Sequence, residues 1–390
     1  MLVLDDVRPR IKRVFPAFPI EQTIYVQRCG EVVEIDDADG RARLLLELLD
    51  GTRTLVEVQR ELAETFPDSS LEDVRTTVQQ LDQAGLIEDG AAAVPLDAYA
   101  QERWKRDLGF YEIYADLATS KYELQRRLRQ CRVALLGLGG VGSHLLYDLM
   151  GMGVEDLRVV DFDTVELSNL NRQILYSEAD IGRRKTEAAT ERVRGFNSRA
   201  RIEARPLRLA SPEDVRAVAD GRDVVIAAVD QPKMQVANWV NEGCVAAGAT
   251  LLTGGVDLQR SFFYTVIPGQ TGCVECWRSG AEADPVSTAI SAEMERIEAR
   301  RPGERFGQDL AAFGPLVTAQ TACLVNELVR VATGIAPPVA AGRMMELRFE
   351  DFTLREAERW ERMPGCRVCG VGEQGVDEPF TQEGPAKVAQ

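Results

Sequence analysis

Histidine is almost absent from the sequence. The 390 residues include one histidine, His144, which excludes a mechanism that needs a histidine pair and also a histidine-rich metal site. His144 directly follows a glycine-rich stretch, where a helix is expected to begin. Because a protonated imidazole is disfavoured near the N-terminus of a helix, we expect His144 to pack or to support other residues and not to act as a catalytic base.

An excess of positive charge is also missing. Asp and Glu outnumber Lys and Arg by 62 to 46, which gives a formal net charge of −16. Such a chain repels a phosphate backbone, so we expect no nucleic-acid partner, whereas a basic peptide is an easier one. No apolar run is long enough to cross a bilayer and no charged-apolar-small leader follows Met1, so we expect a cytoplasmic protein without a membrane partner.

The chain is long enough for two domains. Residues 1–93 combine two short strand patterns around Gly30, three short helical patterns and a last strand in "LIED", which predicts a winged-helix-like domain. Residues 94–130 are expected to be a linker and a helical lead-in, and residues 131–370 the main domain. Within it, residues 281–314 are charged and lack periodicity, which indicates a crossover loop, and the polar tail 371–390 is expected to be disordered.

Strand and helix patterns alternate in the main domain. Buried-strand candidates are "RVALLG", "LRVVDFD", "RIEARPL", "DVVIAAVD" and "TLLTGGV", with helical runs between them. This alternation predicts an α/β fold with a Rossmann-like, doubly wound, mostly parallel sheet. The later strands "SFFYTVIPG" and "MMELRF" are expected to be antiparallel.

A glycine-rich loop joins the first of these strands to the next helix. The stretch "ALLGLGGVGSHLLYDLM" contains Gly137, Gly139, Gly140 and Gly142. Such glycines let the backbone approach a phosphate, and the helix N-terminus offers aligned N–H groups to an anion. Asp161 ends the next strand, where a carboxylate accepts hydrogen bonds from ribose hydroxyls. Up to this point NAD and ATP fit equally well.

The residues that follow favour ATP. Asn171 and Arg172 come shortly after Asp161, and Lys185 follows a turn at Gly182. Fixed cations stabilise the charge that builds on phosphates as pyrophosphate leaves, whereas hydride transfer does not need them. Asp230 ends the strand "DVVIAAVD", where it is placed to hold Mg²⁺ between phosphate oxygens.

The stretches "GLGGVGSH", "DFDTVELSNLNRQIL", "IGRRKTEAA" and the strand-end "AVD" resemble the ThiF/MoeB superfamily, relatives of the ubiquitin-activating enzymes. The resemblance covers roughly residues 102–370 and implies ATP-dependent adenylation of a carboxylate with release of pyrophosphate. It implies that Asp161 binds ribose, that Asn171, Arg172 and Lys185 contact the phosphates, and that Asp230 binds Mg²⁺. The implied nucleotide set is Gly137, Gly139, Gly140, Gly142, Asp161, Asp163, Asn171, Arg172, Lys185 and Asp230. It also implies a homodimer in which Arg106, in "RWKRD", reaches the γ-phosphate of the partner subunit's nucleotide; without the resemblance, Arg106 reads as a surface charge.

Four of the eight cysteines form two matched pairs. Cys273 and Cys276 stand in "GCVEC", and Cys366 and Cys369 stand in "GCRVC". Two such knuckles beside glycine and proline are typical of four thiolates around a structural Zn²⁺, and the resemblance implies the same. A redox role is open for either pair alone. Cys131, Cys244 and Cys323 are expected to pack in the core, although sulfur-transferring members of the superfamily use an extra cysteine, which leaves a reactive role for Cys244 or Cys323 open.

Two resemblances favour a peptide substrate. The N-terminal domain resembles the PqqD-like recognition element of enzymes that modify ribosomally made peptides, which implies that a leader peptide adds as a strand to a sheet edge. The stretches "NRQILYSEADIGRRKTE", "NWVNEGCVAAG" and "VIPGQTGCVEC" are similar to the microcin C peptide adenylyltransferases. The resulting prediction is an adenylyltransferase that activates a carboxylate of a ribosomally synthesised precursor peptide.

Several alternatives stay open at this point. The chain is alternatively a non-catalytic clamp that presents a leader peptide to a separate cyclodehydratase, or an activator of a sulfur-carrier protein. The N-terminal domain is alternatively a dimerisation module; a DNA-binding winged helix is disfavoured by the acidic "EIDDADG". CTP in place of ATP is not excluded by the loop.

Overall fold

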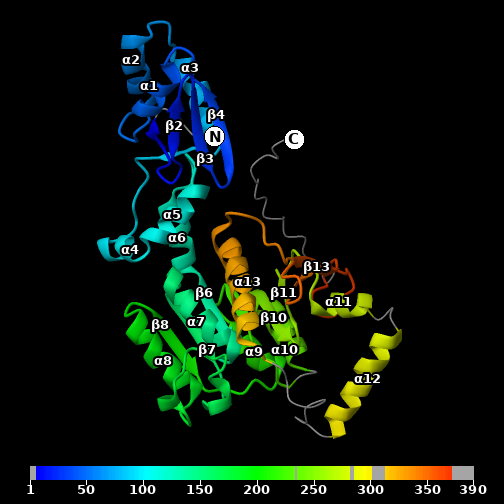
Figure 1. Cartoon of the computed structure of the whole chain (residues 1–390). Helices are drawn as coiled ribbons and strands as arrows, with labels where there is room; N and C mark the ends of the chain where they lie inside the picture. The colour runs from blue at the N-terminus through cyan, green and yellow to red at the C-terminus, as the bar shows by residue number, and fades with distance from the viewer. Residues whose placement is uncertain (1–5, 233–234, 282–284, 301–311, 371–390) are drawn as a thin grey trace.

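A computed structural model describes residues 6–232, 235–281, 285–300 and 312–370. A small N-terminal unit stands at one end, three helices follow it, and a large sheet with helices on both faces forms the rest (Figure 1). None of the helices in these ranges is both long enough and apolar enough to cross a membrane.

The N-terminal unit, here residues 6–93, has two small sheets and three helices. Its strands are β1 (Pro9–Ile11), β2 (Ala17–Ile20), β3 (Thr23–Arg28), β4 (Glu31–Asp36) and β5 (Ile87–Asp89), and its helices are α1 (Arg41–Leu48), α2 (Leu55–Thr65) and α3 (Leu71–Gln83). β1 pairs with β5, while β2, β3 and β4 form an antiparallel sheet with β3 in the middle. Thr54 and Ser70 each open a helix with a reciprocal capping box.

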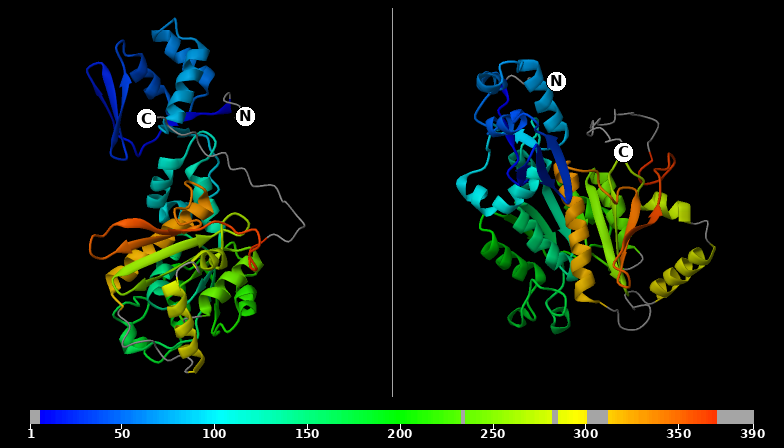
Figure 2. Two further views of the ribbon diagram at one scale, coloured as in Figure 1. Left: turned by 90° about the vertical axis from the view of Figure 1, so that its right-hand side faces the viewer. Right: turned by 45° about the horizontal axis from the view of Figure 1, so that its top comes forward.

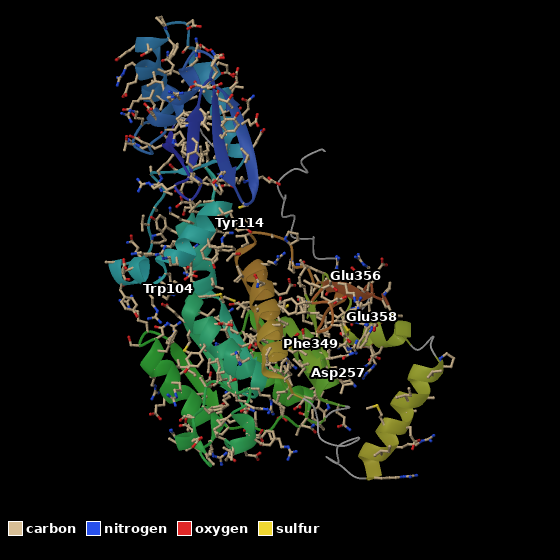
Figure 3. The ribbon with its side chains drawn as sticks, in the orientation of Figure 1. Trp104, Tyr114, Asp257, Phe349, Glu356 and Glu358 are labelled. Atoms are coloured by element: carbon tan, nitrogen blue, oxygen red, sulfur yellow. The ribbon has the colours of Figure 1, made fainter. Side chains whose placement is uncertain are left out.

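Three lead-in helices join this unit to the sheet. They are α4 (Ala98–Arg103), α5 (Lys105–Tyr114) and α6 (Lys121–Gln130). Trp104, between α4 and α5, is fully buried and donates from Nε1 to the Gly151 carbonyl at 2.9 Å (Figure 3). This contact fixes the start of α5 against the C-terminal end of the helix that follows the glycine loop.

The main sheet is doubly wound and mostly parallel, as predicted. Its strands are β6 (Arg132–Leu136), β7 (Asp156–Val160), β8 (Arg201–Arg205), β9 (Val224–Ala227), β10 (Thr250–Asp257), β11 (Arg260–Val266), β12 (Arg343–Arg348) and β13 (Leu354–Arg359). They lie in the order β13-β12-β11-β10-β9-β6-β7-β8. The five strands from β10 to β8 in this order are parallel, and β11, β12 and β13 are added antiparallel. Since β6 continues to β7 on one side and pairs with β9 on the other, the order reverses beside β6, where α/β sheets bind ligands.

Helices cover both faces of the sheet (Figure 2). One face packs on α7 (Gly140–Met152), α8 (Lys185–Phe196) and α13 (Gly314–Thr333), and the other on α9 (Pro212–Ala219) and α10 (Val236–Ala247). Alternate residues of β6 divide between the two cores: Val133 and Leu135 face α7, while Ala134 and Leu136 face α9 and α10. This alternation is the reason that the strand reads as a continuous apolar run.

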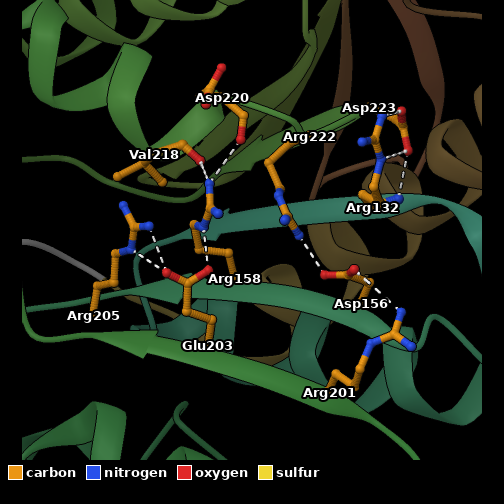
Figure 4. Close-up of polar contacts among 10 residues, drawn as sticks. All are labelled: Arg132, Asp156, Arg158, Arg201, Glu203, Arg205, Val218, Asp220, Arg222 and Asp223. Atoms are coloured by element: carbon orange, nitrogen blue, oxygen red, sulfur yellow. Dashed lines mark hydrogen bonds and ion pairs between the residues drawn. The ribbon is translucent and has the colours of Figure 1, made fainter.

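Ion pairs tie together the strand starts at the end of the sheet away from the glycine loop (Figure 4). Arg158 of β7 pairs with Glu203 of β8 at 2.7 Å and donates to the Val218 and Asp220 carbonyls, at the C-terminal end of α9. Asp156, the first residue of β7, pairs with Arg222 and Arg201. These contacts hold α9 and β8 against β7.

The segment predicted as a crossover loop differs from the expectation. Helix α11 (Val274–Ala281) ends at the first residue of this segment, and helix α12 (Pro285–Arg300) lies inside it, at the right of Figure 1. The charged residues of α12 are exposed wherever their burial is described, and its apolar residues Val286, Ile290 and Ile297 recur at helical spacing but are exposed as well. Residues 282–284, 301–311 and the tail predicted to be disordered, 371–390, lie outside the described residues.

Candidate active site

The glycine loop lies against the end of β9. Gly137 has φ +90°, and a Cβ there would come within 2.4 Å of the Ala228 carbonyl oxygen. A Cβ on Gly142 would come within 1.9 Å of the Gly137 oxygen. Both positions therefore require glycine for the strand–loop–helix turn itself.

The other two glycines leave space on the outer side of the loop. A Cβ on Gly139 would meet nothing nearer than Gln173 Nε2 at 3.9 Å, and one on Gly140 would touch Arg172 side-chain carbons at 3.4 Å. Gly140 opens α7, so its N–H faces the space that these positions border. This is the open cradle that an anion at a helix N-terminus needs.

Asp161 is held at the end of β7 by two backbone groups. Its carboxylate accepts from the Leu138 N–H at 2.7 Å and from the Asp163 N–H at 2.8 Å. Burial raises the pKa of the Asp161 carboxyl, and the charge of Lys185 opposes this. Asp161 thus links the glycine loop to the motif after β7.

Lys185 and Asp163 form the cation–anion pair of the site. Lys185 is the first residue of α8, is buried, and places Nζ 3.0 Å from Asp163 Oδ2. The Asp163 side chain is 49% exposed, so the pair opens to solvent on the Asp163 side. The pair therefore lies beside a surface that an anionic ligand can reach.

The Asn171–Arg172 turn lies beside the glycine loop. Arg172 Nη1 donates to the Ser168 carbonyl at 3.1 Å and to Asn171 Oδ1 at 2.9 Å. His144 Nε2 lies 3.1 Å from the Arg172 carbonyl, which can only accept, so Nε2 carries the proton. His144 therefore supports the backbone of this turn.

Asp230 and Arg106 are placed very differently. Asp230 is exposed beyond β9, two residues after the Ala228 carbonyl that touches Gly137. Arg106 is exposed on α5, which Trp104 fixes at Gly151 near the other end of α7. A helix of 13 residues is about 20 Å long, so Arg106 does not join the other predicted residues within one chain.

The N-terminal turn of α13 completes one wall of this site, and no sequence motif predicted it. A Cβ on Gly314 would lie 3.2 Å from the Asn171 carbonyl, and Val317 borders Gly140. Gly314 and Pro315 are an ordinary helix start, so nothing local marks them as neighbours of a loop more than 170 residues earlier.

The four predicted metal ligands come together. Their sulfurs all lie within 4.8 Å of one another, with Cys273 to Cys366 at 3.7 Å and Cys276 to Cys369 at 3.4 Å. Four thiolates about 2.3 Å from a tetrahedral Zn²⁺ are about 3.8 Å apart, so this donor set fits zinc and is far too open for disulfides. Arg367 pairs with Glu275 and Glu242 and fixes the C-terminal knuckle over α11 and α10.

The other cysteines have the environment of core residues, apart from exposed Cys29. Burial raises the pKa of Cys131 to about 12, and burial with the nearby Glu327 raises that of Cys323 to about 11. Burial also raises the pKa of Cys244 strongly. A thiol with a raised pKa is a poor nucleophile, which supports packing as the role of these residues.

Comparison with known proteins identifies the family to which this chain is similar. The model of the ThiF family matches residues 111–368. The sulfur carrier protein adenylyltransferase of Thermus thermophilus is 30% identical, over 72% of this chain and 96% of that protein. The molybdopterin-synthase adenylyltransferase of Escherichia coli is 29% identical, over 64% of this chain and 91% of that protein.

Among solved structures, E. coli MccB with ATP superposes with a TM-score of 0.72 at 21% identity, over 93% of this chain and 99% of that one. At this identity the similarity establishes a shared fold. The matched family model, the curated relatives and the glycine loop with its ordered neighbours agree, and the chain belongs to the ThiF family, whose curated members matched above are adenylyltransferases.

Proposed function

We propose that this protein is an ATP-dependent adenylyltransferase that activates a carboxylate of a ribosomally synthesised precursor peptide. The observation that carries the proposal is the gathering of Lys185, Arg172 and Asp161 around the open glycine cradle at the point where the strand order reverses. A triphosphate lying in that cradle has its ribose near Asp161 and its phosphates near the two cations.

The proposed reaction breaks one bond and forms one. A peptide carboxylate oxygen attacks the α-phosphorus of ATP, and the bond from that phosphorus to the bridging oxygen of the β-phosphate breaks. Lys185 and Arg172, with Asn171, stabilise the charge that develops on the phosphate oxygens. Asp230 is the residue that would hold Mg²⁺ there, which supplies further charge neutralisation. The products are the acyl-adenylate and pyrophosphate.

The test of adenylation is pyrophosphate release by Asp230→Ala. Asp230 is exposed, so the variant is expected to fold normally and to lose at least about a hundredfold in rate. The matched control is Asp351→Ala, an exposed carboxylate in the turn of the β12–β13 hairpin. Full activity of Asp230→Ala contradicts the proposed mechanism.

A peptide substrate is supported by how much of this chain each similar protein matches. The Thermus relative matches 72% of this chain, whereas MccB, whose structures include one with N-formylated MccA, shares its fold over 93%. Both outer strands of the β2–β3–β4 sheet offer an edge for strand addition, and Ile20 on β2 and Val32 on β4 are exposed.

Edge variants test whether the unit binds peptide. Ile20→Asp and Val32→Asp are expected to weaken binding of the precursor peptide, while Val56→Asp on the exposed side of α2 is not. Deletion of residues 1–93 is a poorer test, because it removes Glu88 from buried Lys121. Unchanged binding in both edge variants contradicts peptide recognition by these strands.

Activation of a sulfur-carrier protein is the second candidate function. The Thermus relative is named a sulfur carrier protein adenylyltransferase, and the E. coli relative a molybdopterin-synthase adenylyltransferase. It predicts adenylation of a protein ending in Gly-Gly that is unaffected by the two edge variants. A non-catalytic clamp, the third possibility, predicts peptide binding without nucleotide binding.

We further propose that the protein is a homodimer in which Arg106 acts across the interface, and that each subunit holds one structural Zn²⁺. Arg106 is too far from its own glycine loop to act there, and its exposure leaves it free to enter the site of the partner subunit. The four clustered cysteines are the proposed Zn²⁺ ligands.

A further inference from the structure

Three arginines meet on one buried carboxylate in the antiparallel part of the main sheet. The carboxylate belongs to Glu346 of β12, whose side chain is only 4% exposed. It accepts from Arg348 Nε and from Arg355 Nε at 2.9 Å each, and from Arg260 Nη1 at 3.2 Å. These hydrogen bonds, led by the one from Arg355, outweigh burial and lower the pKa of the Glu346 carboxyl. Glu346 therefore stays ionised and fixes all three guanidinium groups at the sheet surface.

The three guanidinium groups are accessible and keep unused donors. The side chains of Arg260, Arg348 and Arg355 are 42%, 47% and 42% exposed. Arg348 and Arg355 each use Nε for Glu346, and their Nη groups donate no hydrogen bond to any residue that the structure describes. Asp257 approaches Arg260 Nη2 at 3.6 Å, which is too long for a hydrogen bond. The cluster therefore presents free N–H donors to solvent.

The cluster lies at the same edge of the sheet as the nucleotide-binding residues. β10 and β12 run parallel to β9, and β11 and β13 run antiparallel to it. Arg260 therefore opens β11 and Arg348 ends β12 at the carboxyl edge, where Asp230 follows β9. On the same face of β10, a Cβ on Gly255 would meet only the Phe262 ring, at 3.2 Å, among the described residues. This glycine leaves room for the backbone of an extended peptide between Asp230 and the arginines.

We propose that Arg260, Arg348 and Arg355 bind an acidic side chain of the substrate peptide, a few residues from the carboxylate that is activated. This inference rests on the proposed function, because it takes the activated carboxylate to lie beside Asp230. Neighbouring strands are about 4.8 Å apart, so Glu346 on β12 lies about 14 Å across the sheet from β9, and an extended peptide spans that distance in about four residues. The expected position is an Asp or Glu about three to six residues from the activated carboxylate.

A carboxylate suits this cluster for three reasons. The two Nη groups of Arg348, like those of Arg355, form a planar fork that binds both oxygens of a carboxylate. Because Glu346 already holds the guanidinium groups in place, less side-chain freedom is lost when the peptide binds. A lysine or arginine of the peptide at this point would face three like charges. The cluster therefore selects among peptides and takes no part in adenylation itself.

The experiment is a double-mutant cycle with the short peptide encoded nearest the gene of this protein, here called the natural peptide. Its KM and kcat in pyrophosphate release are compared with those of a peptide in which the Asp or Glu of this window is replaced by its amide. With the full-length wild type, the amide is expected to raise KM at least about tenfold and to leave kcat nearly unchanged, because a hydrogen-bonded charge pair is lost.

Arg348→Ala and Arg355→Ala are each expected to raise KM for the natural peptide and to reduce the ratio between the two peptides at least about threefold. Each variant leaves Glu346 with two guanidinium partners, so both are expected to fold, and the two are independent probes. The matched control is Arg343→Ala, which removes an arginine on the opposite face of β12 that pairs with Glu356, and it is expected to change neither KM.

The outcomes separate peptide selection from adenylation. If the natural peptide is adenylated but has no Asp or Glu in the window, or if its amide has the same KM, the arginines do not select the peptide while the proposed function stands. The same conclusion follows if Arg343→Ala reduces the ratio as much as Arg348→Ala does. If the wild type adenylates neither peptide, the proposed function is overturned and the assignment of the arginines falls with it.

Discussion

At the scale of single residues, the turn that carries Asn171 and Arg172 is followed by a tightly held carboxylate. Asp180 is buried and accepts from Ser177 N–H and Oγ, from Arg183 and from Arg192. Burial alone would raise the pKa of Asp180, but these hydrogen bonds outweigh it and lower the pKa to about 2. This carboxylate therefore fixes the segment between Arg172 and Lys185.

Protonation of Asp180 in acid is expected to weaken these hydrogen bonds. An Asp titrates near 3.9 when unfolded, so the contribution of Asp180 to stability is full above about pH 4 and is lost as the pH falls toward 2. Asp180→Asn is expected to lower stability at pH 7 and to reduce the slope of stability against pH between 4 and 2. Urea unfolding at several pH values measures both, and an unchanged slope contradicts the role given to Asp180.

Motif residues could be predicted at this scale, but their partners could not. The glycines, Asp161 and Lys185 stand in an ordered pattern in the sequence. The Leu138 N–H that donates to Asp161 could not be predicted, because every residue other than proline has a backbone N–H and only the folded loop selects this one. Likewise, the Arg208 guanidinium carbon lies 4.8 Å from the centre of the Phe162 ring, and no sequence signal links the two residues because only the pairing of β7 with β8 brings them together.

At the scale of elements, the N-terminal unit is locked to the lead-in helices by a buried ionic cluster. Lys121 of α6 pairs with Glu112 of α5 and, at 3.2 Å, with Glu88 of β5, which also pairs with Arg10 of β1. Glu112 in turn accepts from the Arg13 N–H at 2.6 Å. The sequence suggested a linker and helical lead-in over residues 94–130, and within it the contact between Lys121 of α6 and Glu88 of β5 holds the two parts together.

Breaking this cluster is expected to be costly. Lys121→Met leaves buried Glu112 without its cation and Glu88 with Arg10 alone, and it is expected to lower the free energy of unfolding by roughly 3–5 kcal/mol. The control, Lys105→Met, removes an exposed pair with Glu102 and is expected to cost less than about 1 kcal/mol. Chemical denaturation compares them, and equal losses contradict the buried cluster.

The cysteine knuckles act at the same scale, because they join α11 to the segment after β13. We expect one zinc per chain by elemental analysis, and we expect Cys366→Ser to lose the metal and to melt at a lower temperature. Cys29→Ser, at an exposed cysteine, serves as control. Full zinc content in Cys366→Ser contradicts the assigned ligand set.

At the scale of the whole molecule, the alternation of strands and helices was sufficient to predict the doubly wound sheet, and two of its three antiparallel strands, β11 and β12, were predicted while β13 was not. Helix α12 was not predicted, although Val286, Ile290, Met294 and Ile297 recur at helical spacing, because the charged residues around them were taken as the mark of a loop. The wall made by α13 was not predicted either, because contacts across more than 170 residues leave no local trace.

The proposed dimer predicts complementation between inactive subunits. Arg106→Ala and Asp230→Ala are each expected to be inactive, while co-expressed mixtures form heterodimers in which one of two sites is intact. With random pairing this restores about a quarter of the wild-type activity. No recovery, with dimers confirmed by sedimentation, contradicts action of Arg106 across the interface.

The most direct test of the account is to identify which phosphate bond is broken. The protein is incubated with MgATP and the short peptide encoded nearest its gene, and the products are analysed by mass spectrometry. Adenylation predicts that adenosine monophosphate is attached to the peptide and that one pyrophosphate is released for each peptide modified, and both products are lost in Asp230→Ala. Formation of ADP and orthophosphate, with the peptide unchanged, would contradict it.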